Sequence, residues 1–226
     1  MPRSIEYRIL EHAQHVFMRY GVRSITMDDL AKGLGISKKT IYQYYSNKAD
    51  LVYEVSKAHF RQEEQNCEIA AQSAVDAIDE MVKVVKWSLE MFSNVAPNLI
   101  FEIQKYYPKA WDLFNEFREH FVLRELRKNL QRGIEEGLYR KNLNLEIVAR
   151  MRIVQIDMSV NPEYFPPNDF PPVEVQSQMF ETYIRGIVTE KGRRLLSKYL
   201  ASSPEKIPPP ATHSIPFPKT KSQEQT

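Results

Sequence analysis

A short stretch from Gly35 to Leu51, which reads GISKKTIYQYYSNKADL, gathers side chains that suit the binding of a polyanion. It holds three lysines and three tyrosines, and no acidic residue precedes Asp50. Ammonium and phenol groups donate hydrogen bonds to phosphate oxygens, whereas a carboxylate in the same place would repel them. This composition predicts contact with the backbone of a nucleic acid.

The first half of the stretch also holds side chains that can read base edges. In the major groove, lysine can donate to guanine, glutamine can pair with adenine, and a threonine methyl can meet the thymine methyl. Such contacts usually come from the N-terminal half of a recognition helix. We expect base contacts from Lys38, Lys39, Thr40 and Gln43, and phosphate contacts from Tyr42, Tyr44 and Lys48.

Four helices are predicted to position these side chains. Apolar residues recur three and four apart in the first of them, and Ser, Thr or Asn stands where each helix begins. The helices are expected from Ser4 to Tyr20, after Thr26 to Gly35, from about Lys38 to Tyr45, and after Asn47 toward residue 66. The second and third form a helix-turn-helix, whose second helix enters the major groove. An ordinary helical bundle with a basic surface is the alternative.

The remainder of the chain is predicted to be helical up to residue 201. With only seven glycines, the sequence does not suit a turn-dense β fold. The segment NPEYFPPNDFPP holds five prolines in twelve residues and must be a loop. Further helices are expected over 73–93, 97–106, 108 to 133 or 137, from Asn144, and over 173–200. The fold class is therefore all-α, with a DNA-binding domain at 1–50, a larger helical domain at 51–201 and a proline-rich, disordered tail at 202–226.

Charge and composition narrow the function further. Residues 1–60 hold nine Lys/Arg against six Asp/Glu, so positive charge is concentrated near the N-terminus. No apolar run approaches the ~20 residues that span a membrane, and the single cysteine, Cys67, favours a reducing cytoplasm. No metal-ligand spacing, phosphate loop or nucleophile motif is found, so we expect no metal, no cofactor and no enzymatic activity.

The segment ITMDDLAKGLGISKKTIYQYYSNKADL resembles the N-terminal signature of the TetR (tetracycline repressor) family. The resemblance covers about residues 5–55, and Tyr45 stands where the family often has phenylalanine. The matching positions are Thr26, Leu30–Ala31, Leu34–Gly35–Ile36–Ser37, Tyr42–Gln43–Tyr44–Tyr45, Lys48 and Leu51. The resemblance implies a homodimeric regulator that binds a pseudo-palindromic double-stranded DNA operator. It also implies phosphate contacts at Thr26, Tyr42, Tyr44 and Lys48.

The resemblance further implies a dimer interface built from two helices of the second domain. Apolar residues that suit this role follow Asn144 and Val173, and ordinary core packing is an equal alternative. They are Ile147, Met151, Val154, Met158, Phe180, Ile184 and Ile187.

A small-molecule effector is expected to bind between helices of the same domain. Apolar walls with a few polar tips are typical of ligand pockets, although aromatic residues at helical spacing are more often plain core. The candidate lining residues for an apolar or aromatic effector are Trp87, Met91, Phe92, Phe101, Tyr107, Trp111 and Phe114. The alternative is a related factor that organises DNA or recruits a protein and has no effector.

Overall fold

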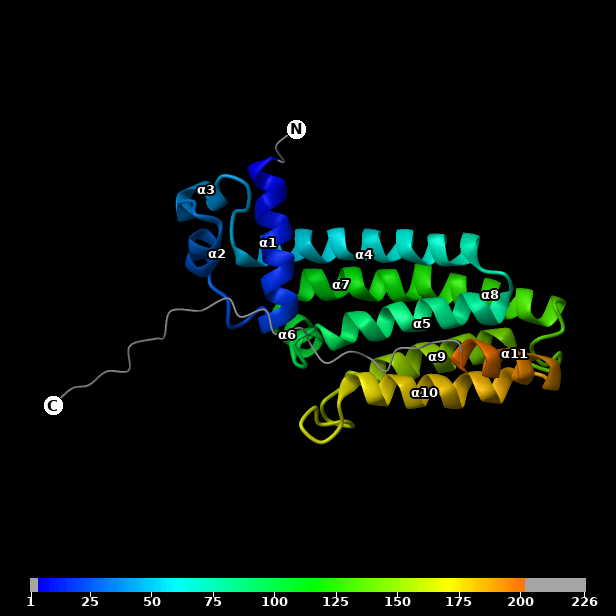
Figure 1. Ribbon diagram of the computed structural model, residues 1–226. Coiled ribbons are helices and arrows are strands. Elements are labelled where there is room, and N and C mark those ends of the chain that lie inside the picture. Colours follow the sequence, from blue (N-terminus) through cyan, green and yellow to red (C-terminus); the bar gives the residue numbers. More distant parts are fainter. Residues whose placement is uncertain (1–3, 202–226) are drawn as a thin grey trace.

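The computed structural model describes residues 4–201, in which every regular element is helical, as the all-α prediction requires (Figure 1). The tail at 202–226, for which disorder is predicted, lies outside these residues. The helices are α1 (Ile5–Tyr20), α2 (Met27–Leu34), α3 (Lys38–Tyr42), α4 (Lys48–Ser73), α5 (Ala77–Ser93), α6 (Leu99–Tyr106), α7 (Pro108–Glu116), η1 (Phe117–Val122), α8 (Leu123–Glu135), α9 (Leu145–Ser159), α10 (Pro172–Ile187) and α11 (Glu190–Ala201).

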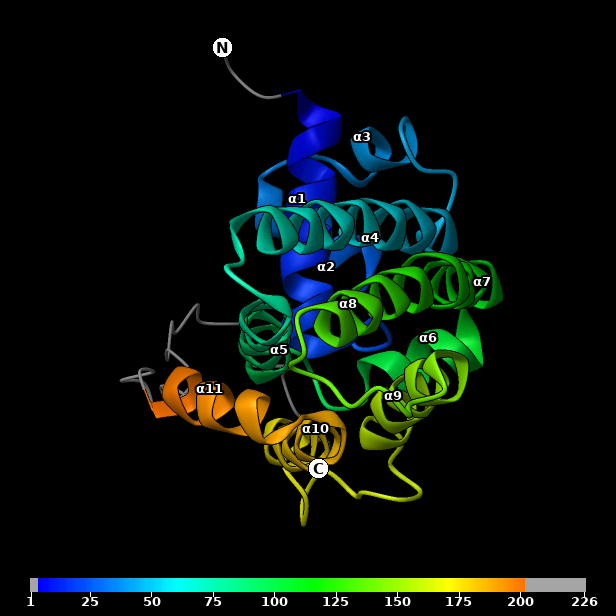
Figure 2. The same cartoon turned by 90° about the vertical axis from the view of Figure 1, so that its right-hand side faces the viewer.

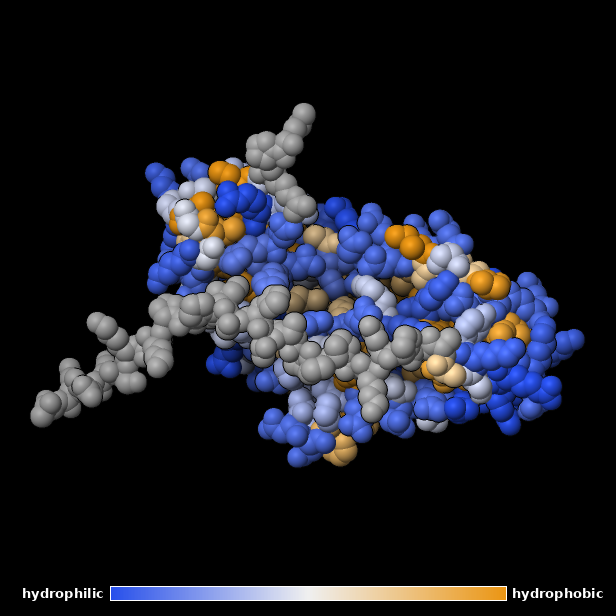
Figure 3. Space-filling view, viewed as in Figure 1, coloured by the Kyte–Doolittle hydropathy of each residue, from blue (hydrophilic) through white to orange (hydrophobic). Residues whose placement is uncertain are grey.

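The helices form a small head and a longer body. The head consists of α1, α2, α3 and the start of α4, and α1 crosses the long helices of the body (Figure 1). Helix α4 continues out of the head and packs against α5 and α7, and α5 packs in turn against α8, α10 and α11 (Figure 2). The face of the body seen in Figure 3 is mainly hydrophilic. No helix within residues 4–201 is long and apolar enough to cross a membrane.

Side-chain caps begin the helices of the head where the sequence predicts them. The Thr26 hydroxyl accepts from the Asp29 amide, and the Asp29 carboxylate accepts from the Thr26 amide, so the two residues form a capping box. Ser37 and Asn47 likewise accept from the third amide of their helices. Gly35 ends α2 at φ 66°, a left-handed conformation that glycine adopts without strain.

The apolar faces of the head helices meet in one core. Ile9 of α1, Leu30 of α2, Ile41 of α3 and Leu51 of α4 are fully buried in it. Tyr45 follows Ile41 by four residues and is also buried there. This core holds α3 in the head beside α2 and leaves the other face of α3 to solvent.

The first difference between the body and the predicted helices lies after Pro108. One long helix is predicted from Pro108, and the structure has α7, η1 and α8 in continuous succession. Within η1 the helix is a π-helix, in which the Leu123 amide donates to the carbonyl of Arg118, five residues earlier. Short π-helical turns are frequent at functional sites.

The single helix predicted over 173–200 is wrong, because the chain breaks between α10 and α11. Val188 has an extended backbone and forms an antiparallel bridge with Tyr139. The Thr189 amide then donates to the carbonyl of Leu138 at 2.8 Å. The Ile187 carbonyl likewise accepts from the Arg140 amide, whereas the Val188 amide still donates to the Ile184 carbonyl as the last bond of α10. Gly192 allows the close approach, since a Cβ atom there would lie 2.3 Å from the Leu138 carbonyl oxygen.

Candidate functional site

Helix α3 presents the predicted DNA-contacting side chains at the surface of the head, away from the body (Figure 1). Lys38, Lys39, Tyr42, Gln43 and Tyr44 are exposed. The helix is shorter than predicted and ends at Tyr42, so Gln43 follows its last turn as the C-cap. One exposed surface therefore combines ammonium, amide and phenol donors, a combination suited to phosphates and base edges.

Three of the predicted contact residues already have partners within the head. The Lys38 ammonium lies 2.8 Å from the Asp28 carboxylate, which holds it toward α2. The Thr26 hydroxyl donates to Asp29 at 2.6 Å. The Thr40 hydroxyl lies 2.8 Å from that of Ser37. These bonds orient the surface, and a DNA contact by any of the three groups must compete with them or share them.

Lys48 lies at the first position of α4 and is half-buried. Burial lowers the pKa of its ammonium group, while the carboxylates of Glu102 and Asp29 oppose that shift. The cation sits beside the free amides of a helix N-terminus, which also attract anions. This position suits a phosphate contact and is linked electrostatically to Glu102 of α6.

Helix α6 fastens the head to the body through contacts that the sequence analysis did not identify. The Arg23 amide donates to the Glu102 carboxylate at 2.8 Å, and the Arg23 guanidinium lies 3.4 Å from the Tyr106 hydroxyl. In addition, the Ala96 amide donates to the Met18 carbonyl at 2.6 Å. The contacts join segments far apart in the chain, so no local sequence pattern could have indicated them.

A cavity of about 280 Å³ lies inside the body, between α4, α5, α7, η1 and α9, and reaches α1 and α6. Most of the predicted effector-contacting side chains line it: Trp87, Met91, Phe92, Trp111 and Phe114. Phe101 and Tyr107 do not. Phe101 is exposed with the Lys105 ammonium over its ring, and Tyr107 packs against the core of the head. Phe101 of α6 therefore faces solvent, and Tyr107, between α6 and α7, faces the head.

Stacked aromatic rings form much of the cavity wall. Phe60 of α4 stacks on Phe117 of η1 with centroids 4.9 Å apart, and Phe117 stacks on Phe121 at 5.3 Å. Trp111 and Phe114 stack at 4.9 Å. The π-helical turn thus places Phe117 and Phe121 on the same wall, joined to α4 by ring contacts.

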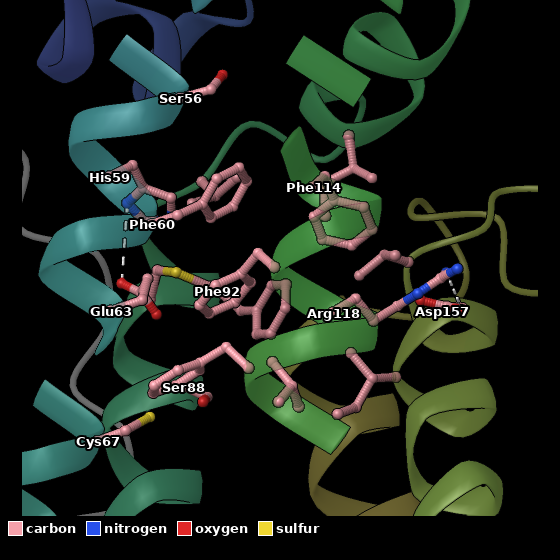
Figure 4. A pocket seen from close by; sticks show the side chains of 18 of the residues that line it. Ser56, His59, Phe60, Glu63, Cys67, Ser88, Phe92, Phe114, Arg118 and Asp157 are labelled. Carbon is pink, nitrogen blue, oxygen red and sulfur yellow. Dashed lines mark hydrogen bonds and ion pairs between the residues drawn. The ribbon is translucent and has the colours of Figure 1, made fainter. Parts of the chain in front are cut away.

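Polar residues of α4, which are not among the predicted effector contacts, also face the cavity. Ser56, His59, Glu63 and Cys67 recur at three- and four-residue spacing and point to the same side (Figure 4). This spacing is the signal in the sequence that places the four side chains on one face of α4. Burial lowers the pKa of His59 to about 4 and raises that of Glu63 to about 8. Their nearest polar atoms are 3.8 Å apart, so the contact is weak.

The residues predicted for a dimer interface divide between two environments. Ile147, Met151 and Val154 of α9 are 58%, 52% and 52% exposed, and Met158 is half-buried. By contrast, the structure corrects the assignment on α10. Its predicted interface residues, Phe180, Ile184 and Ile187, are buried in the core of the subunit, because this face of α10 packs on α5 and α9.

The other face of α10 is open to solvent. Gln178, Thr182 and Gly186 are exposed, and nothing lies within 4 Å of the position a Cβ atom would take on Gly186. Together with the exposed stripe of α9, these small and polar residues form a surface on which another helix can pack closely.

Comparisons with known proteins agree with this geometry. Residues 9–55 match the family of bacterial regulatory proteins described as the tetR family. Over 195 residues the chain is 28% identical to the uncharacterized HTH-type transcriptional regulator YvaF of Bacillus subtilis, covering 83% of this chain and 97% of that protein. It is 22% identical to the HTH-type transcriptional repressor KstR2 of Mycobacterium tuberculosis, covering 81% and 92%.

A solved structure shares the whole fold. The regulator FadR of Bacillus subtilis, in complex with stearoyl-CoA, aligns with a TM-score of 0.60 and 20% identity, covering 80% of this chain and 98% of that one. The similarity therefore extends through the body as well as the head.

Proposed function

The chain is a helix-turn-helix regulator of the TetR family, and we propose that it is a ligand-responsive repressor that binds a pseudo-palindromic operator as a homodimer. The observation that carries the proposal is the connection of two sites by one helix. The N-terminus of α4 lies at the DNA-binding surface, and further along the same helix His59, Glu63 and Cys67 line the cavity. Acting on chromosomal DNA, the protein would work in the cytoplasm.

Two recognition helices are needed to read an operator. One α3 reaches only a few base pairs, and a two-fold dimer supplies the second half-site about 34–36 Å away. We propose that the exposed faces of α9 and α10 make this dimer. The apolar stripe of Ile147, Met151 and Val154 supports the assignment, since stripes of this kind on a subunit surface mark association sites.

We propose that ligand binding alters the position of the head relative to the body. A ligand between α4, η1 and α9 would contact side chains that fix the direction of α4. The cavity also touches Phe17 and Met18 of α1, and α6 holds the loop after α1 through Glu102. A ligand that fits better to one head position shifts the population toward it, and the half-site spacing then no longer matches the operator.

The FadR structure with bound stearoyl-CoA supports a ligand-binding body of this fold. An alternative is a DNA-organising or protein-recruiting factor that has no effector. A cavity of about 280 Å³ with mainly apolar walls favours the ligand-responsive function, because a purely structural body would be expected to fill that space.

Binding to DNA provides the primary test. The purified protein should bind a fluorescent duplex from its own upstream region more tightly than a random duplex of equal length at about 150 mM salt. Equal affinity for the two duplexes would contradict the proposed function. A stoichiometry of two chains per operator is expected in the same titration.

A further inference from the structure

The charged groups on the cavity wall are nearly all paired with one another or with surface residues. Glu80 accepts from Arg132 at 3.1 Å, Glu125 from Arg124 at 2.8 Å, and Asp157 from Arg118 at 2.6 Å (Figure 4). Among the described cavity-lining residues this leaves one acid without a close cation, Glu63, and one cation without an acid, Arg152.

Arg152 is buried on α9 with only 4% of its surface exposed. No acidic group within the described residues forms an ion pair with it, and its Nη1 atom has no hydrogen-bond partner there. Its closest electrostatic partners are the rings of Phe180 and Tyr183, 5.6 and 5.8 Å from the guanidinium carbon. Ring contacts compensate only part of the cost of burying a full charge.

Arg152 and Glu63 differ in whether they can avoid the free-energy cost of a buried charge by becoming neutral. Burial raises the pKa of Glu63 to about 8, so at neutral pH the group takes up a proton and becomes neutral. Burial lowers the pKa of Arg152 to about 10, and the guanidinium therefore still carries its charge at neutral pH. The uncompensated charge on the cavity wall is positive and lies on α9.

We propose that Arg152 binds the carboxylate of an effector whose apolar chain fills the rest of the cavity. The inference rests on the proposed function and adds the chemical class of the ligand, an amphipathic monocarboxylate. A carboxylate can accept two parallel hydrogen bonds from one guanidinium, and in a buried site such charge-assisted bonds are strong. The aliphatic and aromatic side chains between α9 and α4 would pack against the chain (Figure 4). Neutral Glu63, on the opposite wall, would leave this apolar region without a second charge.

Three probes that share a ten-carbon chain and differ in head group test the proposal: decanoate, decanol and decyltrimethylammonium, each kept below its solubility limit or critical micelle concentration. Binding to the full chain is measured by calorimetry and by the shift in melting temperature. We expect decanoate to bind most tightly. Arg152→Met should weaken decanoate binding at least tenfold and leave decanol binding within about twofold, while Arg152→Lys should retain part of the decanoate affinity.

Arg194→Met is the matched control, since Arg194 is an exposed residue of α11 that pairs with Glu190 at 3.5 Å and does not line the cavity. It should bind all three probes as the natural chain does. Circular dichroism checks that Arg152→Met folds, and the loss of an unpaired buried charge should not lower its stability.

Three outcomes would overturn the proposal. They are no decanoate binding to the natural chain, equal decanoate binding by Arg152→Met, or preferential binding of decyltrimethylammonium that Glu63→Gln abolishes. The last result would make Glu63 the anchor of a cationic ligand. Operator binding by the ligand-free natural chain is measured separately, so that failure of the regulatory function and failure of the ligand assignment remain distinguishable.

Discussion

The backbone amide of Arg23 donates a hydrogen bond to the Glu102 carboxylate at 2.8 Å, and this bond joins residues 79 apart in the chain. Arg23 lies in the loop that leads from α1 to the helix-turn-helix, and Glu102 lies on α6 of the body. The bond therefore joins the head to an element that also lines the cavity.

Glu102→Ala should loosen this attachment. Without the carboxylate, the Arg23 amide is expected to exchange its hydrogen several-fold faster, because local opening no longer breaks a charge-assisted bond. Hydrogen-exchange mass spectrometry of a peptide covering residues 18–26 measures the effect. Glu102→Gln keeps an acceptor of similar shape and should have an intermediate rate. Unchanged exchange in Glu102→Ala would show that the bond does not hold the loop.

Lys48 and Gln43 should contribute to DNA binding in different ways. Lys48→Ala is expected to weaken binding to all duplexes alike and to reduce the slope of log affinity against log salt by about one, because a phosphate contact is lost. Gln43→Ala, and likewise Lys39→Ala, should cost about 1–3 kcal/mol at particular base pairs only. Fluorescence anisotropy over a salt series with single-base operator variants measures both. The reverse pattern would contradict these roles.

Dimerisation should depend on the exposed stripe of α9. Met151→Asp places a charge in the middle of that stripe and is expected to convert the dimer to a monomer, since an unpaired charge would be buried at the interface. Sedimentation velocity measures the change. Ile69→Asp is the matched control, because Ile69 is an exposed apolar residue of α4, 62% accessible, outside the proposed interface. A dimer that survives Met151→Asp would place the interface elsewhere.

Gly192→Ala should destabilise the body. The added methyl would lie 2.3 Å from the Leu138 carbonyl oxygen, a backbone atom held in the pairing between residues 138–140 and 187–189. We expect a loss of about 1–3 kcal/mol in the free energy of unfolding. Ser197→Ala, at an exposed position of the same helix, should be neutral or stabilising by up to about 1 kcal/mol. Equal melting temperatures for the two variants would refute the packing argument.

Stability should fall between pH 6.5 and 8 because of Glu63. Its pKa is raised from 4.5 to about 8 on folding, so the folded state binds more protons than the unfolded state in this range, and stability decreases as pH rises. His59, whose pKa is lowered to about 4, acts in the opposite direction and only below pH 6.5. In Glu63→Gln, the decrease in the free energy of unfolding between pH 6.5 and 8 should be smaller by about 1–2 kcal/mol, as measured by denaturant unfolding. An identical pH profile for the variant would exclude Glu63 as the cause.

The helix starts of the head and the exposed face of α3 could be predicted from local sequence. Ser4, Thr26, Ser37 and Asn47 cap their helices through bonds to the third residue that follows, and such local bonds can be read from spacing alone. The periodicity of Ile41 and Tyr45 likewise identified the buried face of α3, and hence the exposed face that carries the lysines and Gln43.

In the body, the sequence could not predict which apolar faces are covered or which side chains reach the cavity. Apolar periodicity shows that a helix has an apolar face, but not which neighbour covers it. Phe180, Ile184 and Ile187 on α10 are covered by the subunit itself, whereas the equally apolar stripe on α9 is left exposed. Likewise Phe101 and Trp111 are both aromatic residues of neighbouring helices, and only Trp111 faces the cavity. The unpaired charge of Arg152 arises in the same way, because it depends on which acids the fold places within reach, and these lie far away in sequence or already bind other cations.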